Sequence, residues 1–234
     1  MGEVDTGTAD SGHGETIERV GLGTGEGEDR FVSATPRGAR SKYGIIIADC
    51  PWAHDNYGMA KHGSAKAHYE ESSLDDIKAV NAGRWAKEEG ALLFLWCTGP
   101  KGAEGHAIEV AKAWGFGGLV TKVFTWVKVN DRCEACGQTW NEHETPVPMD
   151  DFPGAAHGCA RFVPSAYFGT GNYTGGGTED VWLARVGKRP FARERARRDV
   201  RHTIFYPVRE HSKKPEVMQD RIKLLWPHVR GRLE

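Results

Sequence analysis

Apolar residues gather in short stretches that predict the strands and helices of an α/β domain. Residues 43–49 and 91–98 are almost continuous apolar runs, which are typical of strands buried on both faces. Residues 120–129 predict a third strand, and residues 101–114 place apolar side chains at helical spacing before it. Ser73, followed by acids in the next turn, predicts the start of another helix. Strands that alternate with helices in this way predict βαβ units and a mostly parallel sheet.

The alternation of strands and helices stops after the third predicted strand. Residues 131–162 interrupt the alternation and predict a small Cys/His-rich insert. A further strand is expected over residues 179–186, after a glycine-rich turn, and a last helix over residues 214–226. Residues 233–234 are expected to open a final strand, at which the chain stops.

Two segments of opposite charge stand out. Residues 1–30 carry eight acidic and two basic side chains, whereas residues 185–214 carry eleven basic and three acidic ones. Glycines, acids and few large apolar side chains predict a disordered leader over residues 1–40, so that the folded domain covers residues 41–234. The basic segment suits a polyanion such as nucleic acid, although a solvated helix or loop face accounts for it equally well.

The overall composition narrows the class of protein. Hydrophobic residues make up 39% of the chain and charged residues 27%, which predicts a soluble globular protein. No apolar run approaches the roughly 20 residues of a membrane-spanning helix. The N-terminus has no apolar signal-peptide core, so a cytoplasmic location is expected, in the host if the protein is phage-encoded. In that compartment five cysteines argue against a disulfide framework.

The first predicted strand ends in Asp49-Cys50-Pro51-Trp52, the most informative segment of the chain. Open α/β sheets bind ligands at the carboxyl ends of their strands. The segment suits a flat ring that carries an amino group: the ring would stack on Trp52, while Asp49 and the Cys50 carbonyl accept its N–H hydrogens. An ordinary strand ending in a turn is the alternative when these four residues are taken alone.

The same segment resembles the Asp-Pro-Pro-Trp signature of the MT-A70 family of adenine-N6 methyltransferases, of prokaryotic or phage type. Further segments resemble the family in order along residues 43–234, outside the insert. They lie at residues 93–98, 113–116, 125–128, 178–184, 209–215 and 232–234. Each is weak alone, but their order and spacing together make the resemblance specific.

The resemblance implies a Rossmann-like methyltransferase sheet, S-adenosylmethionine as methyl donor and nucleic acid as partner, with DNA favoured over RNA. It implies that Asp49, Cys50, Pro51 and Trp52 hold the target amine in line with the donor methyl group. The residues expected at the cofactor are Ala48, Asp49, Ser212, Lys214 and Glu234. The residues expected at the substrate are Trp52, Asn56, Tyr57, Glu179 and His211. A target adenine in a duplex would have to leave the base stack to reach them.

Two departures from the family pattern qualify these expectations. Cys50 replaces the first proline of the signature, but the required group is a backbone carbonyl, which cysteine also supplies. The chain ends at Glu234, where the family continues into a strand and loop that hold the cofactor. Either the sequence is a fragment or the cofactor site is incomplete. An incomplete site would leave a nucleic-acid-binding pseudoenzyme as an alternative. The same reaction on RNA is a separate alternative.

The insert predicts a metal site. Cys133-x2-Cys136 followed by glycine is typical of a zinc knuckle, in which a tight turn points both thiolates at one ion. Cys159 is the expected third ligand, and His143 and His157 both remain candidates for the fourth, with His143 slightly favoured. Four protein ligands would make the zinc structural rather than catalytic. Three incidental cysteines in a loop are the alternative.

Overall fold

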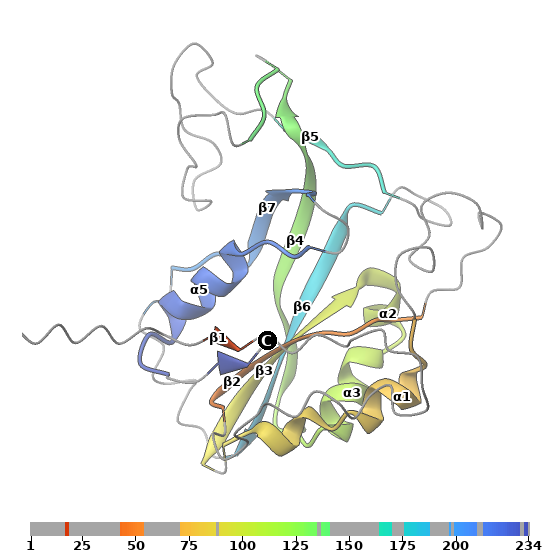
Figure 1. Ribbon diagram of the computed structural model, residues 1–234, viewed down its shortest axis with the longest axis vertical. Coiled ribbons are helices and arrows are strands. Elements are labelled where there is room, and N and C mark those ends of the chain that lie inside the picture. The colour runs from red at the N-terminus through yellow and green to blue at the C-terminus, as the bar shows by residue number, and fades with distance from the viewer. Residues whose placement is uncertain are drawn as a thin grey trace, which may run out of the picture.

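The computed structural model describes the sheet, its helices and the first part of the insert (Figure 1). The described residues are 17–18, 43–53, 71–87, 89–134, 137–140, 164–169, 176–187, 197, 199–209, 213–229 and 232–233. Within them the strands are β1 (Ile17–Glu18), β2 (Ile45–Asp49), β3 (Gly90–Thr98), β4 (Val120–Cys133), β5 (Pro164–Ala166), β6 (Thr178–Gly187), β7 (Thr203–Pro207) and β8 (Arg232–Leu233). The helices are α1 (Leu74–Ala79), the 3₁₀ helix η2 (Ala82–Trp85), α2 (Gly99–Ala103), α3 (His106–Ala113) and α5 (Val217–Leu225).

The strands form one mixed sheet in the order β1-β8-β2-β3-β6-β4-β5, with β7 paired to β4. The pairs β1–β8, β8–β2, β2–β3 and β4–β7 are parallel, whereas β6 is antiparallel to both of its neighbours, β3 and β4. Strands β2, β3, β4 and β7 therefore all point the same way, and their carboxyl ends meet at one edge of the sheet. Because β6 runs the other way, its amino end lies at that same edge.

The α/β fold agrees with the sequence prediction, but β5 and β7 were not predicted, and three other details differ. The expected strand over residues 179–186 is present as β6, but it is antiparallel and lies between β3 and β4. The expected helix over residues 101–114 is two helices, because Gly105 adopts a φ of 83° between α2 and α3. The third strand continues past residue 129 to Cys133, so the insert begins as an extension of β4.

Both ends of the described chain contribute short strands at the side of the sheet where β2 lies. Residues Arg232–Leu233 form β8, in agreement with the expected final strand, and pair with β2. Ile17–Glu18, within the predicted leader, forms β1 against β8. The other residues of the leader lie outside the described part of the chain.

Helices cover both faces of the sheet, giving three layers (Figure 1). The apolar runs of β2 and β3 supply both faces, since successive side chains of a strand point in opposite directions. On one face Leu93, Leu95 and Cys97 pack with α1 and α3. On the other, Phe94 and Trp96 pack in a core with α5. This explains why the runs are continuous rather than alternating.

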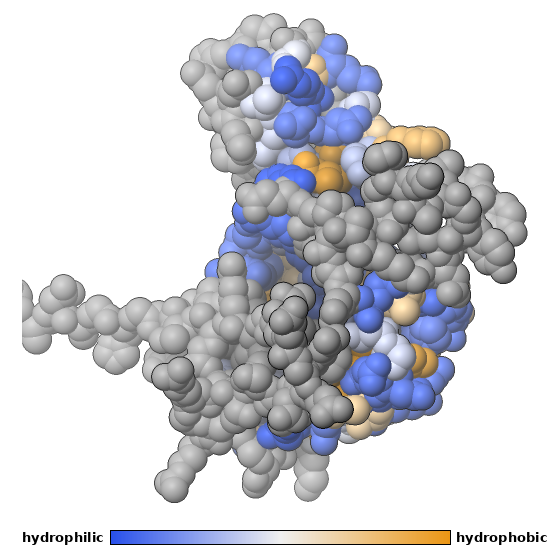
Figure 2. Space-filling model, turned by 45° about the vertical axis from the view of Figure 1, so that its right-hand side comes forward, coloured by the Kyte–Doolittle hydropathy of each residue, from blue (hydrophilic) through white to orange (hydrophobic). Residues whose placement is uncertain are grey.

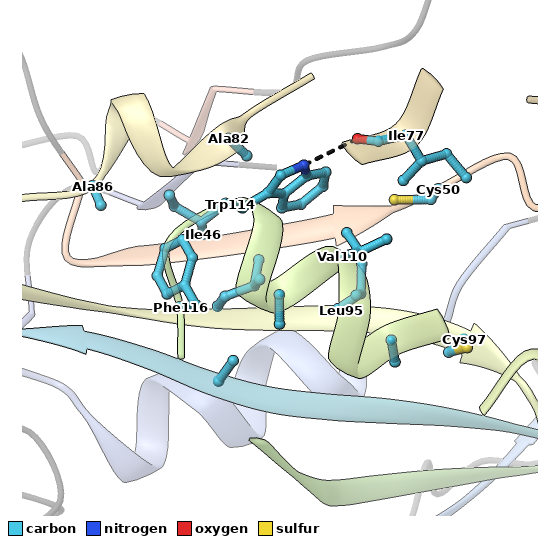
Figure 3. Close-up of a cluster of buried hydrophobic side chains, with 14 of the residues drawn as sticks. Ile46, Cys50, Ile77, Ala82, Ala86, Leu95, Cys97, Val110, Trp114 and Phe116 are labelled. Carbon is cyan, nitrogen blue, oxygen red and sulfur yellow. Dashed lines mark hydrogen bonds between the residues drawn. The ribbon is translucent and has the colours of Figure 1, made fainter. Parts of the chain in front are cut away.

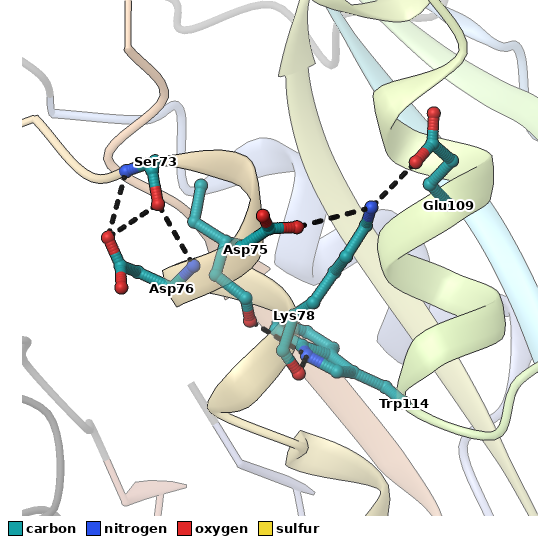
Figure 4. Close-up of polar contacts among 7 residues, drawn as sticks. Ser73, Asp75, Asp76, Lys78, Glu109 and Trp114 are labelled. Carbon is teal, nitrogen blue, oxygen red and sulfur yellow. Dashed lines mark hydrogen bonds and ion pairs between the residues drawn. The ribbon is translucent and has the colours of Figure 1, made fainter.

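The core beneath α1 and α3 is tied together by a buried tryptophan (Figure 3). The indole nitrogen of Trp114 donates to the carbonyl oxygen of Ile77 at 3.0 Å, which fixes the end of α3 against α1. Ser73 begins α1 as expected, with a capping box to Asp76 (Figure 4). Lys78 joins α1 to α3 through an ion pair with Glu109 at 2.6 Å (Figure 4).

Strand β4 extends beyond the body of the sheet and carries β5 with it (Figure 1). On the face shown in Figure 2, the surface of the described residues is mostly hydrophilic, with small apolar areas between the extension and the body. Among the helices described, none is both long and apolar enough to cross a membrane.

Candidate active site at the carboxyl edge of the sheet

Four strands present polar or aromatic side chains on the α5 face at the edge where their carboxyl ends meet. Asp49 pairs in register with Trp96, and Glu179 pairs with Thr98 on one side and Trp126 on the other. Side chains two residues apart along a strand share a face, so Asp49 follows Ile47, a residue of the α5-side core. The same periodicity places Glu179 beside Val181 of that core.

Lys214 is the centre of the polar group. Its Nζ lies 2.9 Å from Oε2 of Glu179 and 3.3 Å from Oδ2 of Asp49. It precedes α5, whose buried residues Met218 and Ile222 anchor the helix on the sheet and hold the lysine over the edge. One ammonium group thus bridges two carboxylates that come from different strands.

Lys128 completes the cluster. Its Nζ lies 2.6 Å from Oε1 of Glu179, so each oxygen of that carboxylate faces a different ammonium group. Indole rings lie below both lysines: Lys128 Nζ is 5.0 Å from the centroid of Trp126, and Lys214 Nζ is 5.6 Å from that of Trp96. Two lysines, two carboxylates and two aromatic rings therefore form one site without net charge.

The charge states of Glu179 and Lys214 are fixed by this arrangement. Burial raises the pKa of Glu179, but Lys214 and Lys128 together lower it further, so the pKa of this carboxyl lies below its usual value. Burial lowers the pKa of Lys214, and the two carboxylates more than reverse this, so its pKa lies above the ordinary range. At neutral pH both groups are charged.

Asp49 behaves differently. Its pKa is raised, because loss of solvation outweighs the attraction of Lys214, and the negative charge of Glu179 adds to the increase. The side chain keeps 42% of its surface exposed, so the shift reflects protein atoms around the carboxylate rather than complete burial. Asp49 is thus a better proton acceptor than an ordinary aspartate and is accessible from outside.

The turn after Asp49 is held by three hydrogen bonds. The backbone N–H of Trp52 donates to the Cys50 carbonyl at 2.9 Å, and that of Ser72 donates to the Pro51 carbonyl at 2.8 Å. The indole nitrogen of Trp52 donates to the carbonyl of Trp96 at 2.9 Å. The Cys50 carbonyl therefore already accepts one hydrogen bond, and only its second lone pair is available to a substrate amine.

Trp52 is a core residue in this structure, only 4% exposed. One face of its indole lies parallel to the ring of His106, with 6.4 Å between the centroids. Nε2 of His106 lies 3.4 Å from a carboxylate oxygen of Glu104, at the junction of α2 and α3. The exposed stacking platform expected at Trp52 is thus not seen, because its indole group is used to fix the strand end.

A buried hydroxyl without a partner lies beside the charged cluster. Oγ1 of Thr98 is inaccessible to solvent and makes no hydrogen bond within the described structure. Thr98 ends β3 and pairs in register with Glu179. Buried polar groups are rarely left unpaired, so this oxygen marks a position where a bound molecule would gain a hydrogen bond.

The described part of the chain contains some of the residues expected in the site. Ala48 lies in β2 next to Asp49, and the structure brings Asp49, Glu179 and Lys214 together. Lys128 was not expected there, although its position at the end of the third strand could have indicated it. The other expected residues, Asn56, Tyr57, His211, Ser212 and Glu234, lie outside the described residues.

Backbone hydrogen bonds join the residues on either side of the expected Cys-x2-Cys turn. The N–H of Gly137 donates to the Cys133 carbonyl at 2.8 Å, and Gly137 has a φ of 73°, which favours glycine. The Cys133 side chain is buried against Trp140. The other expected ligands, Cys136, His143, His157 and Cys159, lie outside the described residues, and the described residues alone contain no group of three or more that could hold a metal ion.

Comparison with known proteins adds one match. Residues 43–150, a little under half of the chain, match the family model described as MT-A70. This range holds β2 to β4 and therefore Asp49 and Lys128, but neither Glu179 nor Lys214. No curated protein matches the chain. Members of the MT-A70 family are S-adenosylmethionine-dependent adenine-N6 methyltransferases that act on DNA or RNA. The part of the chain from residue 43 to residue 150 is thus similar to the MT-A70 methyltransferase family.

Proposed function

We propose that this protein transfers a methyl group from S-adenosylmethionine to N6 of adenine in DNA. The observation that supports the proposal most is the position of Asp49, an accessible carboxylate with a raised pKa at the carboxyl edge of the sheet. It stands within the range that matches the family. A base amine is a neutral hydrogen-bond donor, and a partly desolvated carboxylate is a strong acceptor for it.

The residues of the edge fit the proposed cofactor. S-adenosylmethionine carries a carboxylate, an ammonium, a sulfonium and hydroxyl groups. Lys214 suits the carboxylate, and the unpaired Oγ1 of Thr98 suits a polar group of the bound molecule. When bound, the cofactor supplies an electrophilic methyl group.

Asp49 would position the target nitrogen and take up its proton. The lone pair of the adenine amine is delocalised into the ring, so hydrogen bonds to Asp49 and to the free lone pair of Cys50 would draw the nitrogen toward tetrahedral geometry. As the new N–C bond forms, N6 must lose a proton. Asp49 is the carboxylate placed to receive it, and its raised pKa favours this transfer.

Glu179, which Lys128 also contacts, would hold Lys214 in place while Asp49 binds the incoming amine. Lys214 contacts Glu179 at 2.9 Å and Asp49 at the longer distance of 3.3 Å. Asp49 can therefore exchange its lysine contact for the amine of the base, while Lys214 remains paired with Glu179. In this scheme Glu179 is a positioning residue.

A structural zinc ion in the insert is a further part of the proposal. It is supported by the turn at Cys133 and Gly137, which has the hydrogen bond and the positive φ that a Cys-x2-Cys-Gly knuckle needs. Cys136, Cys159 and either His143 or His157 would supply the remaining ligands.

Transfer of labelled methyl groups tests the proposed function. Purified protein is incubated with labelled S-adenosylmethionine and with adenine-containing duplex DNA, single-stranded DNA or RNA. We expect label in DNA and a loss of about 100-fold or more in Asp49→Asn, the size of effect seen when one group that stabilises a transition state is removed. Asp75→Asn is the matched control, because Asp75 is an exposed carboxylate on α1.

The other outcomes decide between the alternatives. Label in RNA alone would assign the same chemistry to RNA. Failure of the protein to bind S-adenosylmethionine in calorimetry, with no label in any oligomer, would leave the nucleic-acid-binding pseudoenzyme as the remaining alternative.

A further inference from the structure

One aromatic side chain stands apart from all other described residues in its exposure. Phe168 is 85% exposed, compared with 50% for Leu119 and 43% for Leu224, the other large hydrophobic residues on the described surface. A phenylalanine that contacts water over nearly its whole side chain gives up the free energy that its burial would contribute.

The segment that carries Phe168 is hydrogen-bonded to the backbone of Lys128, a residue of the candidate active site. The N–H of Tyr167, its neighbour in the chain, donates to the carbonyl of Lys128 at 3.2 Å. The N–H of Lys128 in turn donates to the carbonyl of Gly177 at 2.8 Å, two residues before Glu179. The segments on both sides of residues 168–176 are thus fixed to the strand that carries a lysine of the charged cluster.

The backbone around Phe168 is closely held. The N–H of Gly169 donates to the carbonyl of Gly176 at 3.1 Å. A Cβ atom on Gly169 would lie 2.3 Å from that carbonyl oxygen, so only glycine permits this approach. A Cβ atom on Gly177 would lie 3.2 Å from the Tyr167 carbonyl oxygen, which is also tight. The chain therefore holds Phe168 in place by its backbone and leaves its ring unpacked.

A fixed, exposed aromatic ring beside a base-modifying site has a specific use. A target adenine must leave the duplex to reach Asp49, and its departure leaves a gap between the neighbouring base pairs. Apolar side chains of other DNA-binding proteins insert between the base steps of a duplex, and aromatic side chains stack on bases of every kind. The flat surface of phenylalanine suits stacking on any base, whereas Leu119 and Leu224 have no flat surface to offer.

We propose that Phe168 enters the base stack of duplex DNA at the position that the target adenine vacates. This inference rests on the proposed function, since it assigns Phe168 a role in presenting the base to Asp49. Phe168 would act on the duplex and not on the reacting atoms, so its effect should be confined to double-stranded substrate.

A fluorescence experiment and a methylation assay test this role together. Duplex DNA carries 2-aminopurine at the target position, where its fluorescence rises when the base leaves the stack. In Phe168→Ala we expect a smaller rise and about tenfold less methylation of duplex adenine, the size of effect typical of one lost stacking contact. Methylation of single-stranded DNA should be unchanged, because no base has to leave a stack.

Two variants serve as controls. Phe168→Trp keeps a stacking surface and should retain the wild-type preference for duplex. Leu119→Ala removes another exposed hydrophobic residue, but directly before the amino end of β4, far from the edge, and should leave both readouts unchanged.

The outcomes separate this inference from the proposed function. Equal loss on duplex and single-stranded DNA, or no loss in Phe168→Ala, would overturn the role of Phe168 while the methyltransferase proposal stands. Absence of methylation by the wild-type protein on every DNA would overturn both.

Discussion

The indole nitrogen of Trp52 donates a hydrogen bond to the backbone carbonyl of Trp96, 2.9 Å away on the neighbouring strand. This bond ties the turn after β2 to the end of β3 and thereby fixes the position of Asp49. The aromatic residue of the signature thus acts first as a brace for the strand end.

Trp52→Phe separates this bracing from the aromatic character of the residue. Phenylalanine keeps an apolar ring but cannot donate, so the variant should lose about 2 kcal/mol of unfolding free energy from the missing hydrogen bond and the smaller core side chain. Methyl transfer should fall with it, because Asp49 is less well placed. Urea denaturation measures the first effect. Trp85→Phe, a half-buried tryptophan on η2, is the control, and an equal loss there would contradict the bracing role.

The activity should depend on the ionisation of Asp49. Its raised pKa means that the carboxylate becomes protonated, and then cannot take up the proton of the amine, at a higher pH than an ordinary aspartate. The rate should therefore fall as the pH drops through this raised pKa. Since Lys214 lowers the pKa of Asp49, Lys214→Met should move the acid limb of kcat/KM to still higher pH.

The pH profile of a second lysine variant makes this prediction specific. Lys223→Met removes an ammonium from α5 that pairs with Asp220 at 3.1 Å, away from the cluster. Its acid limb should coincide with that of the wild type. A Lys214→Met limb at unchanged or lower pH would contradict the assignment of Asp49 as the titrating group.

Asp49 should also cost the fold some stability. Because its folded pKa is raised, the folded state binds a proton more readily than the unfolded state, and stability falls as pH rises between the two pKa values. Above that window the ionised form remains a constant cost. Asp49→Asn should therefore keep or raise the Tm at neutral pH while removing activity, a trade-off common at active sites.

The same substitution of asparagine for aspartate at Asp76 should lower the Tm instead. Asp76→Asn disturbs the capping box with Ser73 at the start of α1 and should cost about 1 kcal/mol. If thermal unfolding showed Asp49→Asn to be several degrees less stable than the wild type, the unfavourable environment of its carboxylate would be disproved.

Glu179 should be a strong stabilising residue of the cluster. Its side chain is 12% exposed and lies between two ammonium groups, so Glu179→Gln leaves both lysines without their shared anion. Breaking a buried charge pair in this way costs about 3–5 kcal/mol. Because the pKa of Glu179 is lowered, its contribution is present above the unfolded pKa and is lost as pH falls through the folded value. Denaturation curves at several pH values measure both effects.

The ion pair between Lys78 and Glu109 provides the comparison, since its atoms are equally close at 2.6 Å but it lies on the helix surface. Glu109→Gln should lower the free energy of unfolding far less than Glu179→Gln does, because solvent screens the surface pair. Similar losses in the two variants would show that burial does not strengthen the Glu179 pairs.

The zinc proposal predicts about one bound metal ion per chain in the purified protein, as expected for a closed site of four protein ligands. Metal analysis should find that Cys136→Ser loses the zinc and that Cys97→Ala, a buried cysteine of the main core, retains it. A wild-type protein purified without zinc would disprove the proposal.

Local patterns predicted the strands that lie next to each other in the chain, together with the acid at the end of β2. The runs at β2 and β3 are apolar because helices cover both faces, and this burial leaves a direct trace in the sequence. Lys214 was also predicted as a residue of the site, but its contact with Asp49 was not predicted. Lys214 reaches Asp49 only because α5 packs over β2, a relationship between segments more than 160 positions apart.

The direction of β6 and the burial of Trp52 were not predictable for a related reason. A buried strand has the same apolar pattern whether it runs parallel or antiparallel, so residues 178–187 did not reveal their position between β3 and β4. The sequence likewise does not distinguish an aromatic residue that faces a ligand from one that, like Trp52, donates a hydrogen bond to a neighbouring carbonyl.

The place of β6 in the sheet has a consequence for how the chain folds. Strand β3 cannot pair with both neighbours until residues 178–187 have been synthesised, some 80 positions after it, and β4 waits for the same strand. Long-range pairing of this kind slows folding. While β6 is absent, β3 and β4 expose unpaired backbone edges, which favour association between chains. Because Glu179 lies on β6, the charged cluster cannot assemble before β6 takes its place between β3 and β4.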